Sequence, residues 1–133
     1  MEGKIKDIYG AKAISGTDSL VKWHNEVIEK SSDELTVADV ARCIRQDLFV
    51  ETAYETLLAY LLNEPYAGDI YPGELMEKAG EVDETVIKKH AATIKTVIDK
   101  AKMFADHHEW DDLDERAEYE EYIEKLKDRL GAI

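Results

Sequence analysis

The chain has 133 residues, of which 44% are hydrophobic, a length and composition typical of one folded domain with a core rather than of a disordered chain. Thirty Asp and Glu residues against seventeen Lys and Arg residues give a net charge of −13, which argues against direct binding to nucleic acid or to an anionic membrane and favours a basic partner. The single cysteine, Cys43, excludes an internal disulfide, and because no apolar run is long enough for a signal peptide or a membrane span, we expect a reduced, cytoplasmic protein.

Apolar residues at helical spacing predict three helices in the first half of the chain. Residues 1–16, which contain three glycines, form either a short docked helix or a loose arm. The first predicted helix is capped by Thr17 or Asp18 and runs to about residue 31. Its apolar stripe comprises Leu20, Trp23, Val27 and Ile28.

The next two helices are separated by a short break. One begins after Thr36, whose spacing from Asp39 is that of a capping box, and ends near residues 46–47. The other covers residues 50–63 and stops before Pro65. Because this helix is apolar over much of its circumference, we expect it to be the most enclosed one.

The second half opens with a loop, NEPYAGDIYPG, that has two prolines, two glycines and two tyrosines. Pro72 suits the first position of a helix, which we expect to end at Ala79. Asp83 caps the longest predicted helix, over residues 84–107, and a final helix is predicted over residues 112–130. No window alternates as a strand does, so the prediction is an all-α, single-domain bundle of five to six helices covering residues 1–133.

Residues 106–124 hold ten acidic side chains and one arginine, which contribute −9 of the total charge. Acids in the first turn of a helix are favoured by its dipole, but Asp114–Glu118 and Glu120–Glu124 are like-charged pairs one turn apart that cost a few tenths of a kcal/mol each. Such a helix face is either simply solvated or an interface for a cationic partner. Trp110, among these acids, either staples the helix junction or anchors an interface.

Metal chemistry is the main enzymatic alternative. His107, His108, Asp111, Asp112 and Glu115 are ligand types of a small metal-dependent phosphohydrolase. However, the segment has neither HExxH nor EF-hand spacing, and the chain has no phosphate-binding glycine motif. His24 and His90 are expected at the core edge, and Cys43 is expected to be a packing thiol. We therefore predict no catalytic, metal or cofactor site.

A set of short motifs suggests a family. Thr36-Val37-x-Asp39, Ile44-x-Gln46 and Pro65-x-Ala67-Gly68-Asp69-x-Tyr71-Pro72-Gly73-Glu74-Leu75 resemble immunity proteins of bacterial contact-dependent growth inhibition (CDI) systems over about residues 35–100. The resemblance implies a protein that binds the C-terminal toxin domain delivered by a neighbouring cell. Such toxins are often nucleases with basic surfaces, which an acidic face would complement.

The predicted function is therefore toxin neutralisation without catalysis. The partner would be a cognate CDI toxin domain, with no direct contact to nucleic acid or membrane. The expected toxin-binding residues are Trp110, Asp111, Asp112, Asp114, Glu115, Glu118, Glu121, Asp69 and Tyr71. A generic helical interaction module stays open as a further alternative, and the loop is read either as a rigid helix connection or as a recognition element.

Overall fold

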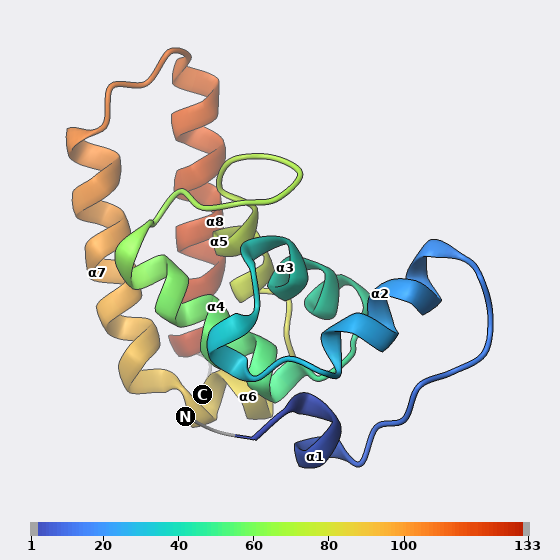
Figure 1. Ribbon diagram of the computed structural model, residues 1–133. Coiled ribbons are helices and arrows are strands. Elements are labelled where there is room, and N and C mark those ends of the chain that lie inside the picture. Colours follow the sequence, from blue (N-terminus) through green and yellow to red (C-terminus); the bar gives the residue numbers. More distant parts are fainter. Residues whose placement is uncertain (1–2, 132–133) are drawn as a thin grey trace.

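A computed structural model describes residues 3–131 of the chain, and its regular elements are helices joined by loops (Figure 1). The elements are α1 (Ile5–Tyr9), α2 (Ser19–Val27), a short 3₁₀ helix η1 (Ser32–Glu34), α3 (Val37–Gln46), α4 (Val50–Asn63), α5 (Glu74–Ala79), α6 (Glu84–Lys89), α7 (Ala91–His107) and α8 (Leu113–Gly131). Within the described part, the backbone pairing outside the helices is limited to one isolated bridge, between Lys4 and Ser31. The predicted all-α bundle is confirmed, with more helices than the five to six expected.

The centre of the bundle is α4, as its apolar circumference predicted. Tyr54, Leu57, Leu58 and Leu61 are each at most 1% exposed. The helix packs against α3 on one side and against α5 and α7 on another. Burying several large side chains from one helix against three neighbours is the main source of stability in such a fold.

The N-terminal segment is docked rather than loose. Ile5 is fully buried in the core, and the amides of Ile5 and Lys6 donate hydrogen bonds to the carbonyl oxygens of Lys30 and Ile28. The residues that supply these two acceptors, Ile28 and Lys30, lie beyond α2, which ends at Val27, earlier than predicted. Leu20, predicted to lie in the core stripe, is 37% exposed in the first turn of α2.

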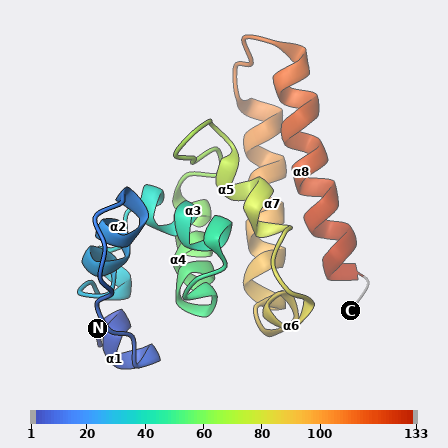
Figure 2. The ribbon, with the colours of Figure 1, turned by 90° about the vertical axis from the view of Figure 1, so that its right-hand side faces the viewer.

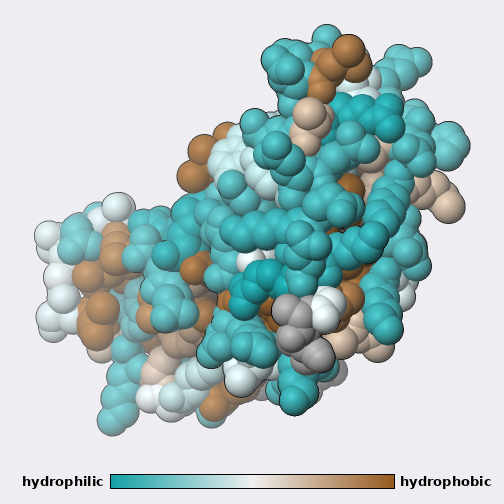
Figure 3. Space-filling view, turned by 180° about the vertical axis from the view of Figure 1, so that it is seen from behind, coloured by the Kyte–Doolittle hydropathy of each residue, from teal (hydrophilic) through white to brown (hydrophobic). Residues whose placement is uncertain are grey.

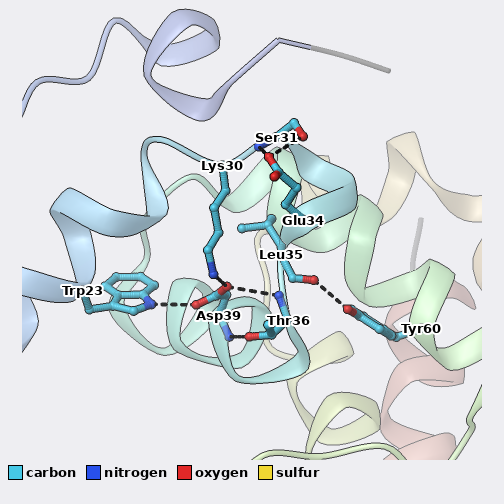
Figure 4. A network of polar contacts seen from close by, with 8 residues as sticks. All are labelled: Trp23, Lys30, Ser31, Glu34, Leu35, Thr36, Asp39 and Tyr60. Atoms are coloured by element: carbon cyan, nitrogen blue, oxygen red, sulfur yellow. Dashed lines mark hydrogen bonds and ion pairs between the residues drawn. The ribbon is translucent and has the colours of Figure 1, made fainter.

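The capping box of α3 belongs to a larger polar network (Figure 4). The Asp39 carboxylate, buried beneath α2, accepts hydrogen bonds from Trp23 Nε1 at 3.0 Å, from Lys30 Nζ at 2.6 Å and from the backbone amide of Thr36 at 3.1 Å. The Tyr60 hydroxyl donates to the carbonyl oxygen of Leu35 in the same connection. These contacts tie α2 and α3 to each other and to α4.

Two helix boundaries differ from prediction. α5 begins at Glu74 rather than at Pro72, because Gly73 precedes it with a φ of 86° that no helix continues. The long helix expected over residues 84–107 is divided at His90, whose backbone leaves the helical region with φ −106° and ψ 19°. The division lets α6 and α7 take different directions, and α8 becomes the longest helix.

The last two long helices form an antiparallel hairpin at the edge of the molecule. α7 and α8 pack along each other, and α8 also contacts α5 and α6. Figure 2 shows that α8 is the outermost helix, and that the loop between α4 and α5 lies beside the upper part of the α7–α8 hairpin. Among the described residues, no helix is both long and apolar enough to cross a membrane.

Candidate functional site

The loop between α4 and α5 is held in shape by one buried carboxylate. Glu74 is fully buried, and its Oε1 accepts hydrogen bonds from the backbone amides of Asp69 at 2.9 Å and Ile70 at 3.0 Å. Its other oxygen binds Arg45 Nη1 at 2.7 Å, and Arg45 also lies 3.7 Å from the Asp69 carboxylate. A charged group bound on both oxygens fixes the loop to α3 and α5.

Two glycines make this loop geometry possible. A Cβ atom on Gly68 would collide with the carbonyl oxygen of Tyr71. Gly73 combines its positive φ with a close approach to the Tyr66 ring, which lies 3.1 Å from the site of a Cβ. The Ala67-Gly68-Asp69-x-Tyr71-Pro72-Gly73-Glu74 motif is therefore, first of all, a rigid connection.

Tyr66 connects the loop to the α7–α8 hairpin through an aromatic cluster. The centroid of its ring lies 5.2 Å from the ring centroids of Trp110 and Tyr119, in edge-on geometry, and 5.6 Å from that of Phe104. The Tyr119 hydroxyl donates to the carbonyl oxygen of Pro65 at 2.6 Å. Edge-to-face pairs of this kind favour one relative placement of the elements that carry them.

Trp110 staples the helix junction. Its indole N–H donates to the carbonyl oxygen of Ala105 at the end of α7 at 2.9 Å, and its partly buried ring packs on the core. Of the two roles considered from the sequence, the geometry supports the staple. The exposed edge of Trp110 borders the acidic residues that follow it.

The structure brings together predicted residues from the loop and from α8. A cleft of about 160 Å³ between these elements is lined by Tyr71 and by the α8 carboxylates Glu115 and Glu118. Tyr66, Pro72, Tyr119 and Tyr122 also line it. The loop and the acidic helix, which the sequence presented as two separate candidates, thus share one surface.

The acidic side chains of α8 are divided between two flanks of the helix. Asp106, Arg116 and Glu120 face one another on the flank toward α7, where Arg116 lies 3.1 Å from Asp106 and 3.5 Å from Glu120. We use the name acidic flank for the opposite side, which consists of Asp111, Glu115, Glu118 and Glu121. Among the described residues, none of these four carboxylates forms an ion pair.

The acidic flank changes the titration of the two tyrosines beside it. Burial raises the pKa of the Tyr66 hydroxyl, and the charges of Glu115, Glu118 and Asp111 raise it further. Burial also raises the pKa of Tyr122, whose hydroxyl donates to Glu118 Oε1 at 2.6 Å. Both phenols therefore remain protonated well above neutral pH.

The other predicted residues have local roles or point to solvent. Asp112 accepts a hydrogen bond from the amide of Asp114 at 2.7 Å and so caps α8. Asp69 pairs with Arg45 at the base of the loop. Asp114 and Glu121 are exposed on α8. Figure 3, which views the molecule from the side of α8, shows a mostly hydrophilic surface, with hydrophobic patches chiefly around the N-terminal part.

The candidate metal ligands do not converge. Over residues 3–131, no group of three or more His, Cys, Asp or Glu side chains is placed to hold a metal ion. His107 Nδ1 lies 2.8 Å from the carbonyl oxygen of Met103, and the His108 ring stacks on Phe104 at 4.7 Å. Cys43 is buried, and burial raises its pKa to about 12, as expected for a packing thiol.

The sequence analysis did not identify the residues that hold the loop and the aromatic cluster in place. Arg45 and Glu74 are 29 positions apart, so helical spacing does not connect them. Tyr66 was part of the recognised loop motif, but its position at the centre of an aromatic cluster depends on residues 38 or more positions away. The available signal was the presence of an acid directly after a Pro-Gly turn, where its carboxylate can reach back to free loop amides.

Comparison with known proteins gives one match. Residues 5–97, more than half of the chain, match a family model described as CDI immunity proteins. Neither the curated proteins nor the solved structures contain a match. The matched span includes the loop and ends within α7, so α8 and its acidic flank lie beyond it.

Proposed function

The chain belongs to the family of CDI immunity proteins, and from this membership we propose that it binds and neutralises the cognate toxin domain of a contact-dependent growth inhibition system. We propose further that the toxin is a basic protein, a nuclease, and that binding takes place in the cytoplasm of the protected cell. The chain acts by occlusion of the toxin surface rather than by catalysis.

The observation that carries this proposal is the acidic flank. Four carboxylates on α8 and in the turn before it form no ion pair with residues 3–131, whereas Asp106 and Glu120 on the other flank are paired with Arg116. Carboxylates left unpaired on one surface repel each other, and a basic partner relieves that repulsion on binding. The net charge of −13 should also raise the rate of association with a basic protein, because opposite charges attract over long distances.

The loop supports the same surface. Glu74 and Arg45 hold Tyr71 beside Glu115 and Glu118 before any partner is present. A preorganised contact surface loses little conformational entropy when it binds. Tyr71 and the exposed edge of Trp110 then supply apolar contact next to the charges.

The test is the association rate with the toxin domain encoded by the neighbouring gene. We expect the rate constant, measured by stopped-flow fluorescence, to fall about tenfold or more between 50 and 500 mM NaCl, because salt screens charge attraction. Charge reversal by E118K/E121K should slow association at low salt. E55K, at an exposed carboxylate of α4 outside this surface, is the control and should have a much smaller effect.

A rate constant that does not change over this range of salt would contradict the electrostatic part of the proposal. Absence of any complex with the neighbouring toxin domain, by size-exclusion chromatography and calorimetry, would contradict the immunity function itself.

A further inference from the structure

The cleft between the loop and α8 has the chemistry of a site for one cationic side chain. Its walls are the aromatic rings of Tyr66, Tyr71 and Tyr122, and the carboxylates of Glu115 and Glu118 lie at its α8 side. Since about 10–15 Å³ of such space holds one water, a cleft of about 160 Å³ has room for a planar group of four heavy atoms. That is the size of a guanidinium group.

We propose that this cleft receives an arginine side chain of the toxin, with the guanidinium group between the tyrosine rings and bound to Glu115 and Glu118. This inference rests on the proposed function, because it names the chemical group by which the basic partner is held.

The carboxylates are free for this contact. Tyr122 occupies one oxygen of Glu118 and leaves the other available, and Glu115 forms no ion pair with a described residue. Three arginines on neighbouring elements are already engaged. Arg45 binds Glu74, Arg116 binds Asp106 and Glu120, and Arg129 donates to the carbonyl oxygens of Gly80 and Val82.

Arginine fits this environment better than lysine for three reasons. A guanidinium group is planar and stacks on aromatic rings, whereas an ammonium group is a compact point charge. It donates several hydrogen bonds in a fixed plane, so it can contact two carboxylates together. It is also more weakly hydrated, which lowers the cost of its transfer into a cleft with tyrosine walls.

The decisive variants are two charge-matched pairs on the same helix. E115Q/E118Q removes both cleft carboxylates, and E120Q/E124Q removes two exposed carboxylates on the flank toward α7. Both changes reduce the negative charge by two and keep the side-chain size. We expect the Kd for the neighbouring toxin domain to rise at least 30-fold in E115Q/E118Q and less than 3-fold in E120Q/E124Q.

A second measurement uses the free protein and needs no toxin. Titration with L-arginine amide, followed by NMR, should shift the signals of Tyr66, Tyr71 and Tyr122 in a saturable way. At equal ionic strength, lysine amide should give smaller shifts, and citrulline amide, whose side chain is uncharged although its α-amino group is not, should give the smallest. The arginine shifts should fall by more than half in E115Q/E118Q and persist in E120Q/E124Q.

The outcomes separate this inference from the proposed function. Equal losses of toxin affinity in the two double variants would overturn the arginine site and leave the immunity function standing. Lysine amide shifts as large as those of arginine amide, or arginine shifts spread over all acidic surfaces, would also overturn it. If the toxin domain does not bind at all, the proposed function fails, and the titration of the free protein still decides whether the cleft binds a guanidinium group.

Discussion

At the scale of single residues, Asp39 shows how one carboxylate can hold three segments together. Burial is the strongest influence on its pKa and raises it, but hydrogen bonds from Lys30, Thr36 and Trp23 together outweigh burial and hold the pKa below its ordinary value. A lowered pKa stabilises the fold above the unfolded-state pKa, and this contribution is lost as the pH falls through the folded-state value. Asp39 thus makes stability depend on pH below about 4.

The variant D39N tests this role. We expect the free energy of unfolding at pH 7 to fall by about 1–3 kcal/mol, since Lys30 and Trp23 lose their charged acceptor. The difference between D39N and the parent should narrow as the pH is lowered below about 4, because the parent then protonates Asp39 as well. Urea unfolding between pH 3 and 7 measures both effects.

The control for this experiment is D99N, at an exposed carboxylate of α7. It should leave the free energy of unfolding nearly unchanged at every pH. Equal effects of D39N and D99N would contradict the role assigned to the Asp39 network.

At the scale of elements, the loop between α4 and α5 is a rigid connection whose shape is fixed by contacts within the chain. Its amides at Asp69 and Ile70 donate to Glu74, and Arg45 neutralises that buried carboxylate. A loop of this length would otherwise lose substantial conformational entropy each time it bound a partner. Its rigidity is therefore part of how the neighbouring cleft keeps its shape.

The variant E74Q tests the rigidity of the loop. Glutamine retains one oxygen acceptor but removes the charge that faces Arg45, so we expect a loss of about 1–3 kcal/mol in unfolding free energy. Hydrogen exchange at the amides of Asp69 and Ile70 should accelerate at least tenfold more than exchange in the centre of α4. The control is E77Q, at a half-buried position of α5 that contacts neither the loop amides nor Arg45. Unchanged protection of the Asp69 and Ile70 amides in E74Q would contradict the role of Glu74 in holding the loop.

At the scale of the whole molecule, the arrangement of charge that we propose favours binding also lowers the stability of the free protein. On the side of α8 away from α7, Asp114 and Glu118 are like charges one turn apart, and neither forms an ion pair with a residue of the described range 3–131. In the flank toward α7, Arg116 relieves the same repulsion. Like charges that form no ion pair therefore cost the free protein some stability.

The double variant E115Q/E118Q should accordingly be more stable than the parent. We expect a rise in Tm of about 1–3 °C at low salt, from the removal of several repulsions of a few tenths of a kcal/mol each. E120Q/E124Q should show no gain, because it also removes the contact between Glu120 and Arg116. Calorimetry at 20 and 300 mM NaCl measures both Tm values. An equal rise in Tm in both variants would contradict the claim that the carboxylates of the acidic flank destabilise the protein more than those of the other flank.

The loop motif and the helical stripes could be predicted from the sequence because they are local. The capping box at Thr36, the enclosed α4 and the cap that Asp112 provides for α8 all depend on residues two to four positions apart. The family resemblance was also carried by such local motifs, and the match over residues 5–97 confirms it. The acidity of residues 106–124 was equally visible in the sequence.

Which acids are free and which are paired was decided only by the tertiary structure. α8 has charges on both flanks, and their environments differ because α7 brings Asp106 to Arg116 while the loop brings Tyr66 and Tyr71 to Glu115 and Glu118. Helical periodicity specifies which side chains share a face, but the energy of a charge depends on what lies opposite it, and that is determined by packing across the fold.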